Sequence, residues 1–259
     1  MILLNDIQIE PTIFPDNTSQ VWNINLPDSR FAEITWRFEK ESEFIHLAQL
    51  VTLLHQYSYV IILYLPYLPY GRQDKKVSQN TTFALRTFIK LLDSLNLDHI
   101  FVLDPHSSLI MEKLDNCTAW YPAYERILLK LPHDFVCYPD QGALNKYNPL
   151  INCYDDKYVP YIFGKKVRDQ ITGQITDYSI KIWEGADSIK DKTILIIDDI
   201  CDGGATFIHL AKKLQEYNVK SISLFVSHGL FTKGLKPLKD AGIDHIYVYN
   251  NNEQGYEEK

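Results

Sequence analysis

The 259-residue sequence lacks the cysteine spacing that marks a structural zinc site or a disulfide-rich domain. Its four cysteines, at positions 117, 137, 153 and 201, include no CxxC pair, and no histidine lies at a zinc-finger offset from them. So few cysteines in a chain of this length indicate reduced thiols, as in cytoplasmic proteins.

Long apolar runs and a basic leader are also missing. The longest apolar stretch, Tyr57–Tyr70, is too short to span a bilayer and contains two prolines. The first ten residues carry Asp6 and Glu10 but no basic region, so they do not resemble a signal peptide. We therefore expect a cytoplasmic protein without a membrane anchor.

Positive charge is scarce. The 26 Lys and Arg residues against 33 Asp and Glu residues give a net charge of −7, which argues against a protein that mainly grips nucleic acid. A hydrophobic content of 46% and a charged content of 23% are typical of a globular protein. The length fits one large domain or two small ones.

Short apolar segments alternate with helical patterns along most of the chain. The predicted strands are Val60–Leu65, His99–Leu103, Phe135–Tyr138, Thr193–Ile197, Ser221–Val226 and His245–Tyr249. The predicted helices are Glu41–His55, Thr81–Leu95 and Thr206–Tyr217. This alternation predicts an α/β protein with a mostly parallel sheet, divided into two units near Ala123–Pro132. Ligands of such sheets bind beyond the carboxyl ends of the strands.

An acidic pair, a glycine turn and a helix start follow the predicted strand Thr193–Ile197. Asp198 and Asp199 could accept hydrogen bonds from sugar hydroxyls or hold a metal. The glycines Gly203–Gly204 let the backbone turn its N–H groups inward, and Thr206 adds a hydroxyl at a helix N-terminus. This combination favours a site for a ribose that carries a phosphate.

The same run resembles the PRPP-binding loop of the type I phosphoribosyltransferase superfamily. Gly203 stands where that pattern has Thr, and Ala205 stands where it has Gly. The resemblance implies a ribose 5-phosphate site formed by Asp198, Asp199, Asp202, Gly203, Gly204, Ala205 and Thr206.

The segment after Val60–Leu65 combines prolines and tyrosines with polar residues. Its arginine offers a planar fork for phosphate oxygens. The run Pro66–Lys76 resembles the Pro-Tyr-x-x-Tyr-Ala-Arg-Gln-Asp-Lys/Arg-Lys signature of the ribose-phosphate diphosphokinase (PRPP synthetase) family. The Arg and Gln of that signature bind ATP, which implies this role for Arg72 and Gln73.

Two further motifs resemble that family's magnesium site. The run Leu103–His106 is similar to its Asp-Leu-His, and Tyr138–Gly142 is similar to its Ser-Pro-Asp-x-Gly. The resemblance implies that His106 contributes to ATP binding and that His106 and Asp140 hold Mg²⁺.

The run Lys165–Arg168 resembles the Lys-x-Arg of the family's catalytic flexible loop. We match Lys166 and Arg168 to this motif, with Lys165 as the alternative for the lysine. The surrounding residues 164–177 are polar and contain glycine, as expected of a mobile flap.

With these motifs in order, the chain is identified as a short, divergent member of the ribose-phosphate diphosphokinase family. The resemblance implies two similar type I phosphoribosyltransferase-like domains, each a mostly parallel sheet flanked by helices. Residues 1–125 would carry the ATP signature, and residues 126–259 the ribose 5-phosphate loop and the flap.

The implied activity is a transfer of diphosphate from Mg-ATP to the C1 hydroxyl of ribose 5-phosphate, giving PRPP and AMP for nucleotide biosynthesis. The implied assembly is a homo-oligomer, either a dimer or a hexamer, with no nucleic-acid partner. Two alternatives stay open. One is a catalytically silent relative that binds nucleotide or regulates a partner. The other is a phosphoribosyltransferase that consumes PRPP and has no need of the Pro66–Lys76 signature.

Overall fold

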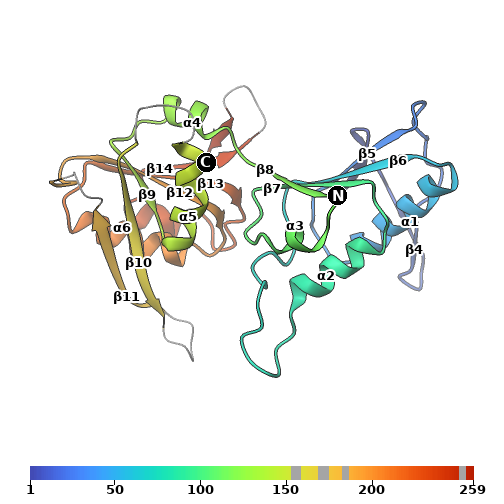
Figure 1. Cartoon of the computed structure of the whole chain (residues 1–259), viewed down its shortest axis with the longest axis horizontal. Helices are drawn as coiled ribbons and strands as arrows, with labels where there is room; N and C mark the ends of the chain where they lie inside the picture. The colour runs from blue at the N-terminus through green and yellow to red at the C-terminus, as the bar shows by residue number, and fades with distance from the viewer. Residues whose placement is uncertain (153–158, 169–174, 183–186, 251–254) are drawn as a thin grey trace. The chain divides into compact units, whose positions relative to one another are not determined.

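The chain forms two compact units, Met1–Tyr121 and Pro122–Lys259. The computed structural model describes residues 1–152, 159–168, 175–182, 187–250 and 255–259. Each unit has its own mostly parallel sheet with helices packed on it, which confirms the predicted α/β class (Figure 1). The domain boundary predicted between residues 125 and 126 falls inside helix α4 (Tyr124–Lys130) of the second unit.

Unit 1 has a sheet of order β2-β1-β5-β6-β7-β8, in which β5 to β8 run parallel and β1 is antiparallel to β5. Its strands are β1 (Ile2–Leu4), β2 (Ile7–Gln8), β5 (Phe31–Trp36), β6 (Val60–Leu65), β7 (His99–Leu103) and β8 (Cys117–Trp120). Its helices are α1 (Glu43–Gln56), α2 (Ala84–Asp93) and α3 (Leu109–Lys113). Strands β3 (Thr12–Ile13) and β4 (Ser19–Gln20) form a separate hairpin.

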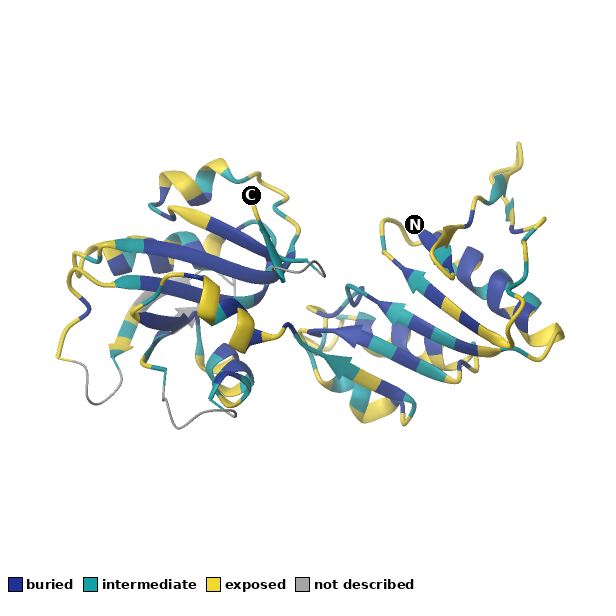
Figure 2. Ribbon diagram, turned by 90° about the horizontal axis from the view of Figure 1, so that it is seen from above, coloured by how far each residue is buried: buried dark blue, intermediate teal, exposed yellow. Residues whose placement is uncertain are grey.

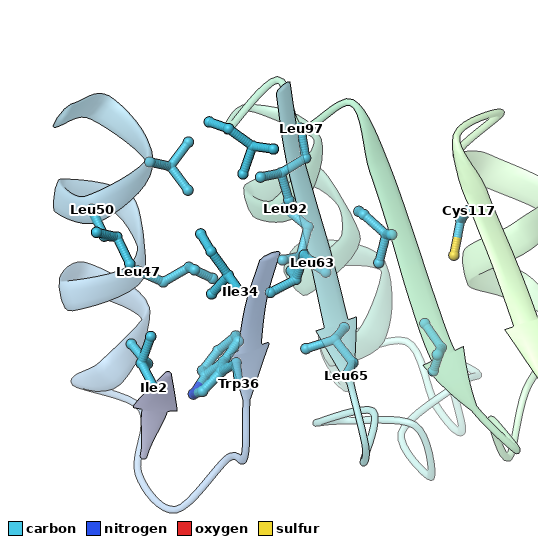
Figure 3. Close-up of a cluster of buried hydrophobic side chains, with 14 of the residues drawn as sticks. Ile2, Ile34, Trp36, Leu47, Leu50, Leu63, Leu65, Leu92, Leu97 and Cys117 are labelled. Atoms are coloured by element: carbon cyan, nitrogen blue, oxygen red, sulfur yellow. The ribbon is translucent and has the colours of Figure 1, made fainter. Parts of the chain in front are cut away.

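Helices α1 to α3 lie on one side of this sheet (Figure 1). The strands β5 to β8 follow one another in order across the sheet, and right-handed crossovers then carry every connecting helix to the same face. Burial alternates along the strands of this sheet (Figure 2). In β5 and β6, Ile34 and Leu63 are fully buried between more exposed neighbours. Figure 3 shows these residues packed with Trp36, Leu47 and Leu50, each aliphatic side chain contributing roughly 1.5–3 kcal/mol by burial.

Unit 2 has a sheet of order β11-β10-β9-β12-β13-β14-β15. Its strands are β9 (Phe135–Tyr138), β10 (Tyr161–Arg168), β11 (Ile175–Ile182), β12 (Thr193–Cys201), β13 (Ser221–Gly229), β14 (His245–Tyr249) and β15 (Tyr256–Glu258). Its helices are α4, α5 (Gln141–Ile151), α6 (Ala205–Gln215) and α7 (Lys236–Asp240). Strands β10, β9, β12, β13 and β14 are parallel, and β11 and β15 are antiparallel to their neighbours.

The strand order of unit 2 reverses between β9 and β12. The chain moves from β9 through α5 to β10 in one direction, and from β12 through α6 to β13 in the other. Right-handed crossovers therefore place α5 and α6 on opposite faces. Strand β12 is accordingly buried along most of its length (Figure 2). The carboxyl edge at such a reversal is where α/β sheets bind ligands.

Two strands of unit 2 are longer than the sequence predicts. Strand β12 continues from the predicted end at Ile197 to Cys201, and β13 continues to Gly229, paired with it to the end. The ladder joins backbone groups, so polar side chains do not interrupt it. Asp198 and Asp199 therefore belong to β12, instead of following it as predicted.

No helix among the described residues is long and apolar enough to cross a membrane. The described cysteines, Cys117, Cys137 and Cys201, are buried, and none of them forms a disulfide bond. Burial raises the pKa of the Cys117 thiol to about 11, so it is a poor nucleophile at neutral pH. Cys153 lies outside the described residues.

Candidate active site

The predicted ATP-binding turn of unit 1 follows β6. The backbone N–H of Gly71 donates to Leu68 O at 3.2 Å, and that of Gln73 donates to Tyr70 O at 2.9 Å. A Cβ atom at Gly71 would lie 3.1 Å from Leu68 O and 3.7 Å from Cβ of His106. The turn therefore packs directly against His106, which follows β7, and unit 1 brings the predicted ATP-binding residues to one edge of its sheet.

Tyr70, within this turn, packs against Phe88 of α2 and bonds to Glu41. Its ring centroid lies 5.2 Å from that of Phe88, and its hydroxyl donates to Glu41 Oε1 at 2.7 Å. Burial and the hydrogen bond to Glu41 raise the pKa of Tyr70 to about 12, so the hydroxyl stays neutral at physiological pH. Arg72 and Gln73, which follow Tyr70 in this turn, are exposed.

Asp104 was missed as a candidate site residue. It is fully buried between β7 and His106, with a positive φ of 37°. Its N–H donates to Trp120 O at 2.8 Å, which ties the end of β7 to the end of β8. Only Pro105 separates this buried acid from His106, so Asp104 belongs to the same edge. The sequence signal for Asp104 is its position directly after an apolar strand, where ligands of such sheets bind.

In unit 2, two of the predicted acids lie on either side of the strand reversal. Asp140 follows β9 and caps α5, because its Oδ1 accepts from Ala143 N at 3.0 Å. Asp199 lies on β12 and forms an ion pair with Lys146 of α5, at 3.1 Å between Nζ and Oδ2. The Asp199 side chain is only 7% exposed. Helix α5 thus supplies both an acid and the counter-charge for a second acid.

The charged side chains of Asp140, Asp199 and Lys146 shift the pKa of Asp198. Loss of hydration, followed by the negative charges of Asp199 and Asp140, raises the pKa of Asp198, while the N–H of Asp199 and the Lys146 ammonium oppose the rise. Negative charge is therefore crowded at the edge of the sheet. Such a site stabilises hydrogen-bond donors, including sugar hydroxyls, and cations.

The predicted phosphate loop lies between β12 and α6. Gly204 has a φ of +74° and is the N-cap residue of α6. A Cβ atom there would lie 2.9 Å from Leu238 Cδ2, so both the backbone conformation and the packing favour glycine. The Asp202 carboxylate accepts a hydrogen bond from Thr232 Oγ1, which joins the loop to the segment after β13.

The first turn of α6 provides the predicted anion-binding end. Ala205 is exposed and Thr206 is partly exposed, as is Gly203 in the loop before them. The first N–H groups of a helix lack intrahelical acceptors and carry its positive dipole end. This turn can therefore present backbone donors to an anion.

The predicted catalytic residues Lys166 and Arg168 lie on β10. In the ladder with β11, Lys166 pairs with Tyr178 and Arg168 pairs with Ile175, with a register shift between positions 167 and 168. The predicted flap is therefore, where it is described, an antiparallel hairpin. Residues 169–174 lie outside the described residues.

The predicted magnesium residues belong to different units, His106 to unit 1 and Asp140 to unit 2. Within the described ranges, no three His, Cys, Asp or Glu side chains gather as a metal-binding group. The donor chemistry of Asp140 fits Mg²⁺, because its carboxylate offers the oxygen ligands that this ion prefers.

Comparisons with known proteins show which sequences and folds this chain resembles. Residues 144–253 match the family described as "Phosphoribosyl transferase domain". The chain is 24% identical over 256 residues to ribose-phosphate pyrophosphokinase of Saccharolobus solfataricus, covering 94% of this chain and 84% of that protein. It is 25% identical over 248 residues to ribose-phosphate pyrophosphokinase of Pyrococcus furiosus, covering 93% and 85%.

A solved structure shows the same fold. The phosphoribosylpyrophosphate synthetase from Mycobacterium smegmatis matches with a TM-score of 0.71 at 21% identity, over 94% of this chain and 80% of that one. The predicted resemblance is thereby confirmed. The chain is similar to ribose-phosphate pyrophosphokinases (diphosphokinases) over most of its length, and residues 144–253 match the phosphoribosyl transferase domain family.

Proposed function

We propose that this protein is a ribose-phosphate diphosphokinase, which converts Mg-ATP and ribose 5-phosphate to PRPP and AMP. One observation carries the proposal. The carboxyl edge of unit 2 joins the acids Asp140, Asp198 and Asp199 to the glycine loop and the first turn of α6. Hydroxyl acceptors next to an anion-binding helix end match a sugar phosphate.

In the proposed reaction, the C1 hydroxyl oxygen of ribose 5-phosphate attacks the β-phosphorus of ATP. The bond from this phosphorus to the oxygen that bridges it to the α-phosphate breaks, AMP leaves, and the hydroxyl proton passes to solvent. Such transfers depend on alignment and on stabilisation of developing charge, more than on covalent catalysis.

The chain's residues divide these tasks in the proposal. Asp198 and Asp199 accept hydrogen bonds from the ribose hydroxyls, and the loop Asp202–Thr206 binds the 5-phosphate. Arg72, Gln73 and His106 bind ATP from the edge of unit 1. Lys166 and Arg168 of β10 stabilise the charge that develops on the transferred group.

Magnesium enters the proposal as the partner of ATP. His106 and Asp140 are the residues that would hold it, and it would supply neutralisation of phosphate charge when bound. The homo-oligomeric assembly and the cytoplasmic location stay predictions.

The direct test incubates the protein with ribose 5-phosphate, ATP and Mg²⁺ and measures AMP and PRPP together. We expect equal amounts of the two products. For Lys166→Ala we expect kcat to fall by about 100- to 1,000-fold, as for removal of one transition-state donor, with both KM values nearly unchanged. Lys181→Ala, which removes an exposed lysine on the adjacent strand β11, is the matched control and should keep its activity.

Two outcomes would overturn parts of this proposal. A folded protein that binds ATP but forms no AMP would favour the silent, regulatory relative. If Lys165→Ala lowers kcat and Lys166→Ala does not, the catalytic lysine is Lys165 instead of Lys166.

A further inference from the structure

Lys233 lies against the predicted phosphate loop, although no sequence motif singled it out. It belongs to the segment between β13 and α7. A Cβ atom built on Gly203 would lie 3.5 Å from both Cδ and Cε of Lys233, and 3.9 Å from its Cγ. The aliphatic part of this lysine therefore runs alongside Gly203.

The position of Lys233 is set by the framework around it. The N–H groups of Leu230 and Phe231 both donate to Cys201 O, at 2.9 and 3.1 Å. The adjacent Thr232 hydroxyl donates to the Asp202 carboxylate within the loop. These bonds hold the three residues before the lysine to the end of β12, where the phosphate loop begins.

The ammonium group of Lys233 is not neutralised by a carboxylate among the described residues. Its side chain is exposed, and it makes no hydrogen bond or ion pair with any residue in the described part of the chain. Lys146, in contrast, is already paired with Asp199. A cation beside the positive end of the eleven-residue helix α6 creates a region suited to a dianion.

Resting on the proposed ribose 5-phosphate site, we propose that Lys233 binds the 5-phosphate group of that substrate. Gly203 stands where the related loops have Thr, so one hydroxyl donor is missing here. Because glycine has no side chain, the lysine stem can occupy the space beside the loop. Lys233 replaces the missing hydroxyl with a charged donor and makes the site selective for a phosphorylated sugar.

The test measures equilibrium binding of ribose 5-phosphate to the full chain by isothermal titration calorimetry. Lys233→Met keeps the aliphatic stem and removes the charge. We expect about tenfold weaker binding of ribose 5-phosphate, the scale of one charge-assisted hydrogen bond, and unchanged ATP binding. Lys233→Arg should bind within about threefold of the original protein, because it restores the charge.

Lys236→Ala is the matched control, because Lys236 is a nearby exposed lysine paired with Asp240 at 2.8 Å. It should leave ribose 5-phosphate binding unchanged. Equal affinity in Lys233→Met and the original protein would overturn the assignment of Lys233. Absence of ribose 5-phosphate binding by the original, folded protein would instead overturn the proposed function.

A double substitution separates binding from a general structural effect. Combined with Lys233→Ala, Gly203→Thr restores the hydroxyl of the related loops in the space that the lysine stem occupied. We expect Gly203→Thr to recover most of the affinity that Lys233→Ala loses. If the double variant binds ribose 5-phosphate more weakly than Lys233→Ala, the threonine hydroxyl does not replace the lysine ammonium as a donor, which would contradict the proposal.

Discussion

Replacing Lys146 by methionine would remove the ammonium that lies 3.1 Å from Asp199 Oδ2. The Coulomb attraction at this distance is about 5 kcal/mol with an effective dielectric constant of about 20. Removal of one partner from a buried ion pair costs about 3–5 kcal/mol, because the other charge stays buried. The Lys146 side chain is 20% exposed, so some hydration relieves the loss. We therefore expect unit 2 to lose about 3 kcal/mol of unfolding free energy.

Hydrogen exchange read by mass spectrometry is the appropriate assay, because the two units need not unfold together. Amides of β12 and β13 should exchange about 100-fold faster in Lys146→Met under conditions where exchange follows the opening equilibrium. Amides of β5 and β6 in unit 1 provide an internal reference and should not change.

The double variant Lys146→Met, Asp199→Asn decides whether charge is the cause. The asparagine removes the stranded carboxylate, so we expect the double variant to recover most of the lost protection. Protection in Lys146→Met equal to that of the original protein would refute the energetic importance of the pair. A double variant no better than the single one would refute the electrostatic explanation.

Two further predictions concern stability. Gly204→Ala should destabilise unit 2 by about 2–3 kcal/mol in urea denaturation, because the left-handed backbone and the contact with Leu238 both penalise a side chain. Gly234→Ala is the control, since Gly234 has a φ of +71° with no atom within 4 Å of the added Cβ; its cost should be limited to about 1–2 kcal/mol of backbone strain, and equal costs would contradict the packing argument. For Glu43, burial alone would raise the pKa, but hydrogen bonds from the Met1 ammonium, the Trp36 indole and the Glu39 N–H outweigh it and lower the pKa from 4.5. Its stabilisation should be complete above pH 4.5 and be lost as the pH falls through the lower folded pKa, so Glu43→Gln should flatten the acid side of a stability–pH curve; an unchanged slope would contradict this.

The sequence predicted the strands best where apolar runs end sharply. The bounds of β6, β7, β9 and β14 agree with the predicted segments, because each is a short apolar run flanked by turn or charged residues. Strand β5 was not predicted, since its alternating burial leaves Phe31 and Glu33 exposed and interrupts the apolar run. Helix α5 was not predicted either, because Gly142 and Pro149 within it argue against a helix by propensity.

Site residues followed a similar division. Asp198, Asp199 and Gly204 could be located because they lie within one short motif at the end of an apolar run. Lys146 and Lys233 could not, because each reaches the site across the fold. Lys146 meets Asp199 through the packing of α5 on β12, and Lys233 meets Gly203 through the segment after β13. No local pattern encodes either contact.

The extension of β12 through Asp198 and Asp199 has a consequence for the entropy of binding. Fixing one residue's backbone costs about 1–2 kcal/mol, and the ladder with β13 already imposes this cost when the chain folds. A ligand that meets these carboxylates therefore does not have to order their backbone. Affinity for the sugar end of a ligand should then depend on hydrogen-bond geometry and solvation, with little conformational entropy left to lose at these two positions.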